Sequence, residues 1–254
     1  MVQTAAPGDG PRPLSDPILE KVRAFYEDHH DSIARARHSH RYFYDSLIRA
    51  VQARVPEGER VLDIGCGSGH LLAALRPSWG VGIDISTRAV AAARKAHPGE
   101  HLHFIEGDGS AKEVLAQVGG PFDVIVMINV VTHLKDVQAA FEALHAVCHP
   151  RTRLLVYSYS RLWQPLLRLG EIMGFKHRPP PDAWLPPEEI RNMMTLADFE
   201  VVRGDYQVIC PARIPLLADF LNGWVGHLPA IEWMSLMYGI VARPAWYRFA
   251  GHRS

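Results

Sequence analysis

The sequence lacks three features: an excess of one charge, paired cysteines and a long apolar run. Lys plus Arg and Asp plus Glu number 27 each, without a clustered basic stripe, so composition does not favour nucleic acid or an acidic membrane as a partner. Cys66, Cys148 and Cys210 form no CxxC pair, which favours free thiols in a reducing compartment over a disulfide framework. No run is long enough to span a bilayer and no secretory pattern is present, so we expect a cytoplasmic protein.

The chain is expected to divide into a short tail, a helical segment and one larger domain. Residues 1–15 are rich in Pro, Gly and Ala, which predicts disorder. Residues 16–56 show apolar residues at helical spacing. Residues 57–254 are interpreted as one domain with two covering insertions, at about 161–190 and 211–234, and the sequence contains no internal repeat.

Short β-rich runs alternate with helical patterns from residue 60 onward. The predicted strands are Arg60–Ile64, Gly80–Asp84, Leu102–Glu106, Phe122–Ile128, Arg153–Ser158, Phe199–Ile209 and Met237–Ala242. The helices predicted between the earlier strands are Leu71–Arg76, Thr87–Lys95, Lys112–Val118 and Val137–Val147. This alternation indicates a doubly wound α/β sheet with right-handed crossovers. The longer late connections make the far edge a candidate for antiparallel pairing.

The stretch "RVLDIGCGSGHLLAAL" (residues 60–75) places three glycines between a strand and a helix. We predict that Gly65 permits a tight turn, Gly67 lets a ligand approach the backbone and Gly69 lets the helix pack closely on the strand. Backbone N–H groups at the helix N-terminus would face that ligand. Glycine spacing alone is shared by several nucleotide-binding folds.

Two acidic residues at strand ends further support a nucleotide-binding site at this loop. Asp84 ends the second strand, where a carboxylate can accept hydrogen bonds from both hydroxyls of a ribose. Asp108 ends the third strand and can accept from an exocyclic amine such as that of adenine. A simple turn at Asp108–Gly109 is the alternative explanation for the second acid.

The runs "VLDIGCGSG", "VGIDIS", "IEGDGS" and "FDVIVMINVVTHL", in this order and spacing, resemble the class I S-adenosylmethionine-dependent methyltransferases. The resemblance covers about residues 60–149 and implies a Rossmann-like seven-stranded sheet with S-adenosylmethionine as cofactor. It assigns the methionine part of the cofactor to Asp63 and to the loop residues Gly65, Cys66, Gly67 and Gly69. It assigns the ribose and adenine to Asp84, Ile85, Asp108 and Gly109, and the methionine amino group and methyl exit to Asn129 and Val130.

Other roles for two of these residues remain open. Asp63 could instead cap the loop without touching the ligand. Cys66 is interpreted as a small packing residue, because nothing in the sequence indicates a lowered pKa for its thiol.

The catalytic candidates are His133 and Tyr157. His133 follows the fourth strand near the expected methyl exit, although Thr132 stands where many family members carry an acid; a base and a packing histidine are both open. Tyr157 and Tyr159 end the fifth strand, and we expect one of them to face the acceptor and the other to point away. The aromatic and basic residues of 16–56 either form a solvated helix face or reach the site from a lid, and we expect no metal site among the histidines.

Longer stretches, including "WLPPEEIRNMMTLADFEVV", resemble bacterial methyltransferase domains found alone or fused to glycosyltransferases. This resemblance implies methyl transfer to oxygen or nitrogen of a small molecule or glycan. The apolar stretch 211–234 either packs on the sheet or receives a lipid-linked acceptor or the second copy of a homodimer. The competing hypotheses are another reaction on the same cofactor and a non-catalytic S-adenosylmethionine-binding partner domain.

Overall fold

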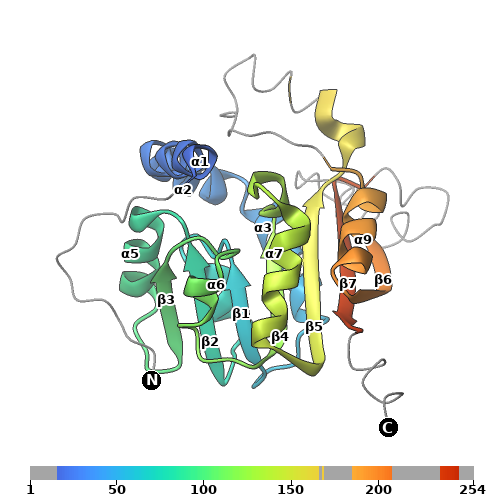
Figure 1. Ribbon diagram of the computed structural model, residues 1–254. Helices are drawn as coiled ribbons and strands as arrows, with labels where there is room; N and C mark the ends of the chain where they lie inside the picture. The colour runs from blue at the N-terminus through green and yellow to red at the C-terminus, as the bar shows by residue number, and fades with distance from the viewer. Residues whose placement is uncertain (1–15, 166–167, 169–184, 208–234, 246–254) are drawn as a thin grey trace, which may run out of the picture.

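A computed structural model describes residues 16–165, 168, 185–207 and 235–245 (Figure 1). The predictions for 1–15 and 211–234, and for most of 161–190, fall outside this part of the chain. Within it, seven strands form one sheet in the order β3-β2-β1-β4-β5-β7-β6, which confirms the predicted seven-stranded architecture. The strands are β1 (Arg60–Ile64), β2 (Trp79–Asp84), β3 (Leu102–Glu106), β4 (Phe122–Ile128), β5 (Cys148–Tyr159), β6 (Phe199–Gln207) and β7 (Met237–Pro244).

The strands from β3 to β5 run parallel, and the late part of the sheet is mixed. β7 pairs antiparallel with both β5 and β6, so the outermost strand β6 runs in the same direction as the first five. The predicted antiparallel pairing at the far side is therefore present, and it is confined to β7. The carboxyl ends of the parallel strands share one edge of the sheet, at the top of Figure 1.

Helices cover both faces of the sheet, as burial of the central strands requires. Every residue of β1 after Arg60 is buried, a pattern typical of a parallel strand that is packed on both sides. The helices α3 (Arg41–Gln52), α4 (His70–Ala74) and α5 (Thr87–Ala96) contribute to the core of one face. The helices α6 (Lys112–Leu115), α7 (Val137–Leu144) and α9 (Pro187–Leu196) contribute to the core of the other face.

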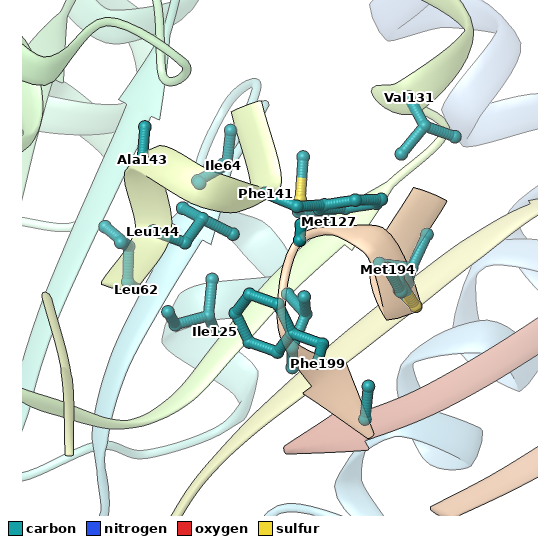
Figure 2. Close-up of a cluster of buried hydrophobic side chains, with 14 of the residues drawn as sticks. Leu62, Ile64, Ile125, Met127, Val131, Phe141, Ala143, Leu144, Met194 and Phe199 are labelled. Carbon is teal, nitrogen blue, oxygen red and sulfur yellow. The ribbon is translucent and has the colours of Figure 1, made fainter. Parts of the chain in front are cut away.

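The second of these cores is shown in Figure 2. Phe141 and Leu144 of α7 pack there with Met194 of α9 and with Ile125 of β4, all almost completely buried. The predicted helices are all present with small differences in their ends. The predicted helix at Val137–Val147 ends at Leu144 and continues as the 3-10 turn η2 (His145–Val147).

The predicted helical segment 16–56 contains α3 and two further helices, α1 (Pro17–Asp28) and α2 (His30–Ser39). Figure 1 shows α1 and α2 lying across the carboxyl edge of the sheet. Asp16 caps α1 by accepting from the Ile18 N–H at 2.7 Å, and the same carboxylate forms a 2.7 Å ion pair with Lys135 after β4. None of the described helices is long and apolar enough to cross a membrane.

A second attachment joins these helices to the loop after β2. Arg88, in the first turn of α5, donates to the Glu27 carbonyl oxygen at 3.0 Å and forms a 3.0 Å ion pair with Asp31. The helical layer α1–α2 therefore contacts the loops that follow β2 and β4. A role as a lid, predicted from the family resemblance, is consistent with this placement and stays a prediction.

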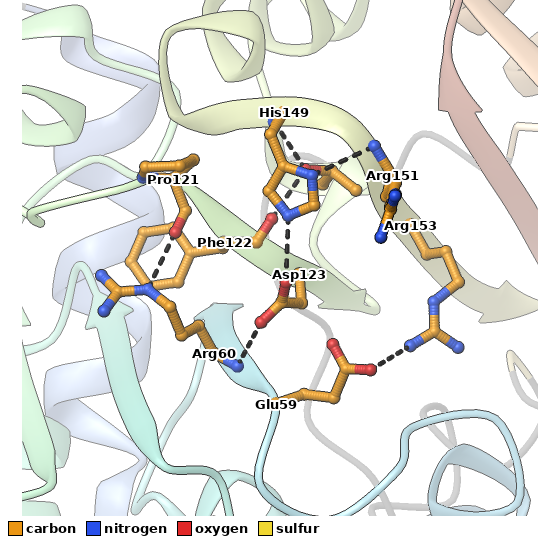
Figure 3. A network of polar contacts seen from close by, with 9 residues as sticks. Glu59, Arg60, Pro121, Phe122, Asp123, His149, Arg151 and Arg153 are labelled. Carbon is orange, nitrogen blue, oxygen red and sulfur yellow. Dashed lines mark hydrogen bonds and ion pairs between the residues drawn. The ribbon is translucent and has the colours of Figure 1, made fainter.

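A polar network lies where β1 and β4 begin, at the edge opposite α1 and α2 (Figure 3). Asp123 accepts from the Arg60 backbone N–H at 2.8 Å and contacts His149 Nε2 at 3.0 Å. The Arg151 N–H donates to His149 Nδ1 at 3.1 Å, so the proton on Nε2 is the one that points to Asp123. Burial opposes the charge of Asp123, but these hydrogen bonds outweigh it and hold the pKa of Asp123 below its ordinary value.

We expect Asp123→Ala to lower the free energy of unfolding by about 1–2 kcal/mol, because Arg60 and His149 lose their acceptor. Urea unfolding followed by tryptophan fluorescence measures this change. The matched control is Glu57→Ala, which removes an exposed 3.0 Å ion pair with Arg76 and should cost less than about 1 kcal/mol. Equal losses in the two variants would contradict a structural role for the network.

Candidate functional site

A cavity of about 520 Å³ lies at the carboxyl edge of the sheet, between the loops that follow β1–β4 and the helices α1–α3. Most of the predicted site residues line it: Asp63, Gly65, Cys66, Gly67, Asp84, Ile85, Asp108, Gly109, Asn129, Val130 and His133. Two predicted residues do not line it, Gly69 and Tyr157. The sequence therefore located the sheet side of this cavity from residues scattered over four strand ends.

The three glycines of the first loop are all left-handed, with φ of +76° at Gly65, +54° at Gly67 and +76° at Gly69. A Cβ on Gly65 would collide with the Val130 side chain, and a Cβ on Gly69 would lie 2.6 Å from the Phe104 ring. A Cβ on Gly67 would meet no atom within 4 Å. Gly65 and Gly69 are thus constrained by packing, and Gly67 exposes its backbone to open space, where a ligand can approach it.

Asp84 organises the loop from the end of β2. One carboxylate oxygen accepts from the Gly67 N–H at 2.7 Å and the other from the Ser86 N–H at 2.9 Å. Burial raises the pKa of Asp84, while these two hydrogen bonds oppose the rise. Each oxygen keeps acceptor capacity beyond its one backbone bond, so Asp84 can still accept from a pair of ribose hydroxyls.

Asp63, at the end of β1, is buried and incompletely paired. Within the described residues its Oδ2 has no hydrogen-bond partner. Burial and the neighbouring charge of Asp84 raise the pKa of Asp63 to about 7, while Arg37 acts in the opposite direction. Asn129 is similar: its φ is +56°, and its Oδ1 is buried and unpaired among the described residues.

Asp63 and Asn129 both line the cavity, and each has one buried acceptor oxygen that finds no donor among the described residues. A buried acceptor without a donor costs free energy, so a ligand that supplies N–H groups fits this place. The ammonium of a cofactor's amino-acid part is such a donor. The residues present therefore fit the methionine end of S-adenosylmethionine on their chemistry, independent of the motif resemblance.

Asp108 and Cys66 have local explanations as well. Asp108 accepts from both the backbone N–H and the hydroxyl of Ser110, at 2.9 and 2.6 Å, so it closes its own turn while lining the cavity. Cys66 is buried, and burial raises the pKa of its thiol well above the ordinary value. A thiol that stays protonated is a poor nucleophile, which agrees with the packing role predicted for Cys66.

His133 has a partner from the N-terminal helices. Its Nε2 lies 3.0 Å from the Tyr26 hydroxyl of α1, and the two rings meet edge to face with centroids 5.7 Å apart. Burial, and then the charge of Asp84, raise the pKa of Tyr26, so its hydroxyl is protonated at neutral pH. Both side chains line the cavity.

Sequence reasoning did not separate Tyr26 from the other aromatic and basic residues of 16–56. The structure does: Tyr26, His30, Arg37 and Tyr44 line the cavity, whereas His29, Arg35, His38, His40 and Arg41 do not. The signal was available, because positions 26, 30, 33 and 37 follow the spacing of one helical face. The sequence did not indicate whether that face points toward the cavity or toward solvent.

Tyr157 does not fit the catalytic role predicted for it. Its side chain is completely buried in the core beside α3, and a Cβ on Gly239 of β7 would lie 2.6 Å from its ring. The alternate tyrosine, Tyr159, stacks on Phe43 with centroids 6.3 Å apart. A hydrogen bond with the Asn129 side chain partly offsets the rise that burial causes in the pKa of Tyr159. Tyr157 and Tyr159 thus lie on the same face of β5, against the core beside α3.

A family profile described as a methyltransferase domain matches residues 35–203, about two thirds of the chain. The chain belongs to this methyltransferase family. A Brucella ovis protein named ubiquinone biosynthesis O-methyltransferase is 33% identical over 162 residues, 58% of this chain and 62% of that protein. A protein of the same name from Aromatoleum aromaticum is 29% identical over 119 residues, 43% and 48% of the two chains. The alignments thus span less than two thirds of these curated relatives.

Solved methyltransferases share the architecture. An S-adenosylmethionine-dependent methyltransferase from Thermotoga maritima superposes with a TM-score of 0.64 at 18% identity, covering 87% of this chain and 99% of that one. Magnesium protoporphyrin IX methyltransferase from Synechocystis, solved with bound S-adenosylhomocysteine, gives 0.61 at 18% identity, with 89% and 99% covered. At these identities the likeness concerns the fold, and it confirms the class I methyltransferase fold.

The raised pKa of Asp63 predicts a pH-dependent stability of the ligand-free methyltransferase. Ionisation of Asp63 in the folded protein costs stability as pH rises from near 3.8 through about 7. Asp63→Asn should therefore gain thermal stability relative to the unsubstituted protein across that window, by at most about 4 kcal/mol, and should bind cofactor more weakly. The control Asp45→Asn, at an exposed ion pair with Arg41, should show no such trend. Parallel Tm curves for Asp63→Asn and the unsubstituted protein would refute the burial of this charge.

Asp84→Ala tests the ribose contact. The variant would lose the predicted charge-assisted hydrogen bonds to the ribose and the acceptor that holds the Gly67 amide, so S-adenosylhomocysteine should bind about 1.5–3 kcal/mol more weakly. Titration calorimetry measures the affinity. Asp84→Asn keeps one neutral acceptor and should give an intermediate loss, whereas an unchanged affinity for both variants is incompatible with the assignment.

Proposed function

We propose that this methyltransferase transfers the methyl group of S-adenosylmethionine to a hydroxyl of a small, largely apolar acceptor. The observation that carries this proposal is the Tyr26–His133 contact of 3.0 Å in the cavity, next to the predicted methyl exit at Asn129 and Val130. The relatives named O-methyltransferase support oxygen over nitrogen as the methylated atom. The fold and the family support the cofactor.

The chain's contribution to such a reaction is alignment. The bound cofactor supplies an electrophilic methyl group on a sulfonium, which an acceptor attacks in line with the departing sulfur. Asp63, Asn129 and Asp84 hold polar parts of the cofactor and so fix its position relative to the sheet. Apolar side chains from the helices, among them Leu19, Val22 and Ile33, line the same cavity and would exclude water from the acceptor.

A hydroxyl acceptor also needs a path for its proton, and the Tyr26–His133 pair provides one. With Tyr26 protonated, its O–H can donate to an unprotonated His133 Nε2, which leaves the Tyr26 oxygen free to accept a hydrogen bond from the acceptor hydroxyl. As the acceptor oxygen bonds to the methyl carbon, its proton passes to the Tyr26 oxygen and the Tyr26 proton passes to His133. Charge is balanced, since the sulfonium loses its charge and the imidazole gains one.

His133→Gln should lower kcat/KM by about 10²–10⁴-fold, because the proton acceptor is lost. Tyr26→Phe should lower kcat/KM less and shift its pH profile, since His133 keeps its place but loses the relay. The measurement uses S-adenosylmethionine with a labelled methyl group and a panel of phenols and aliphatic alcohols, with product detection by mass spectrometry. His38→Gln, at an exposed position of α2, is the matched control and should leave turnover unchanged.

Label on nitrogen products alone, or full turnover by His133→Gln, would overturn the hydroxyl assignment. A glycan or lipid-linked acceptor and a homodimer remain predictions, because the stretch 211–234 on which they depend lies outside the described residues. A cytoplasmic location likewise stays a prediction from composition.

A further inference from the structure

Two histidine rings meet beside the glycine loop. Nδ1 of His70, the first residue of α4, lies 3.1 Å from Nε2 of His97, which follows the last residue of α5. The two rings are almost perpendicular, at 88°, and their centroids are 5.2 Å apart. This contact joins residues 27 positions apart in the chain, and neither the proposed methyl transfer nor the cofactor assignment uses it.

The backbone and the packing around each ring determine where the two rings meet. His70 directly follows the left-handed Gly69, and it lines the cavity while it stays exposed. His97 ends α5, where its N–H donates to the Ala93 carbonyl oxygen at 2.9 Å, and its ring lies beside Phe104 with centroids 6.3 Å apart. A Cβ on Gly69 would lie 3.1 Å from the His97 ring. The two nitrogens are therefore brought together by the fold at a place that solvent reaches.

A separation of 3.1 Å between two imidazole nitrogens suits two kinds of interaction. In a hydrogen bond, one ring donates its N–H to the unprotonated nitrogen of the other. In a metal site, two imidazole nitrogens at about 2.0–2.1 Å from one ion lie about 2.9 Å apart at a right angle and about 3.3 Å apart at the tetrahedral angle. The observed distance falls between these values, so an ion can replace the shared proton after a small rotation of the exposed His70 ring.

The chemistry of the pair selects the class of ion. Imidazole nitrogen suits Zn²⁺, Ni²⁺ and Cu²⁺, whereas Mg²⁺ and Ca²⁺ prefer oxygen. Within the described residues, no third His, Cys, Asp or Glu side chain joins the pair in a metal-binding group, so the other positions on an ion would be filled by water. Arg37 lines the same cavity, and its charge opposes a cation at His70. Binding therefore requires both nitrogens.

We propose that His70 and His97 form a two-histidine site for a divalent transition-metal ion such as Ni²⁺ or Zn²⁺. The ion links the residue that follows the glycine loop to the end of α5, and it thereby restrains the loop that lines the cavity. The site is separate from the proposed methyl transfer and does not depend on it.

The test measures the affinity for Ni²⁺ by titration calorimetry. Ni²⁺ is the probe because the thiols of this chain compete for it less than for Zn²⁺. His70→Gln and His97→Gln should each bind Ni²⁺ at least about 10–100-fold more weakly, since groups that only orient a metal ligand already contribute that much. His101→Gln, at an exposed position shortly after His97, is the matched control and should bind like the unsubstituted protein. Arg37→Met should bind Ni²⁺ more tightly, because an opposing charge is removed.

Stability and hydrogen exchange provide readouts independent of calorimetry. Ni²⁺ should raise the Tm of the unsubstituted protein, because it binds the folded state, and it should slow hydrogen exchange in residues 65–75. Neither effect should appear in His70→Gln or His97→Gln. Equal Ni²⁺ affinity and equal Tm shifts in the unsubstituted protein and both variants would identify an adventitious ion only and overturn the inference, while leaving the proposed function standing.

Discussion

Two carboxylates side by side in a desolvated edge of the sheet are the constraint around which the site is arranged. The amides of Gly67 and Ser86 donate to Asp84 and oppose the rise that burial causes in its pKa, and this requires the left-handed glycine loop. Within the described residues the Asp63 Oδ2 has no donor, and burial together with the charge of Asp84 raises the pKa of Asp63 to about 7. The protein thus supplies backbone donors to one carboxylate and leaves an oxygen of the other without a donor among the described residues. A cation bound at Asp63 relieves both the burial of this charge and its repulsion from Asp84.

The N-terminal helices contribute hydrogen-bond donors to the cavity, whereas the strand ends contribute acceptors. The strand ends contribute acceptors, and α1–α3 contribute the guanidinium of Arg37 and the hydroxyl of Tyr26. The attachments of this layer come from the site's own loops, through Lys135 after β4 and Arg88 after β2. The position of the helices therefore depends on the same loops that would hold the cofactor. If these loops moved when the cofactor binds, the helices α1 and α2 attached to them would move as well.

The sheet side of the site was predictable because its signals are local. A left-handed turn demands glycine at fixed positions, and an acid at a strand end in a parallel sheet must lie at the common edge. Tyr157 does not fit the role expected for it because Tyr157 and Tyr159, two residues apart, share one face of β5, and that face packs on the core beside α3. Tyr26 and Arg37 fit the spacing of one helical face in the sequence, although they lie on the separate helices α1 and α2. Its direction is set by contacts to residues more than fifty positions away, which no local pattern encodes.

The two sides of the cavity are also under different physical demands. In-line methyl transfer requires alignment and no covalent intermediate, so the acceptor side can take many forms that place an oxygen correctly. The residues that bind the cofactor must match the fixed charges of one molecule, so few arrangements of side chains can serve on that side of the cavity. The family profile begins at residue 35, so it includes Asp63, Asp84 and His133 but not Tyr26 on α1. The Tyr26–His133 contact therefore joins a residue inside the matched region to one outside it, and the proton path proposed above crosses that boundary.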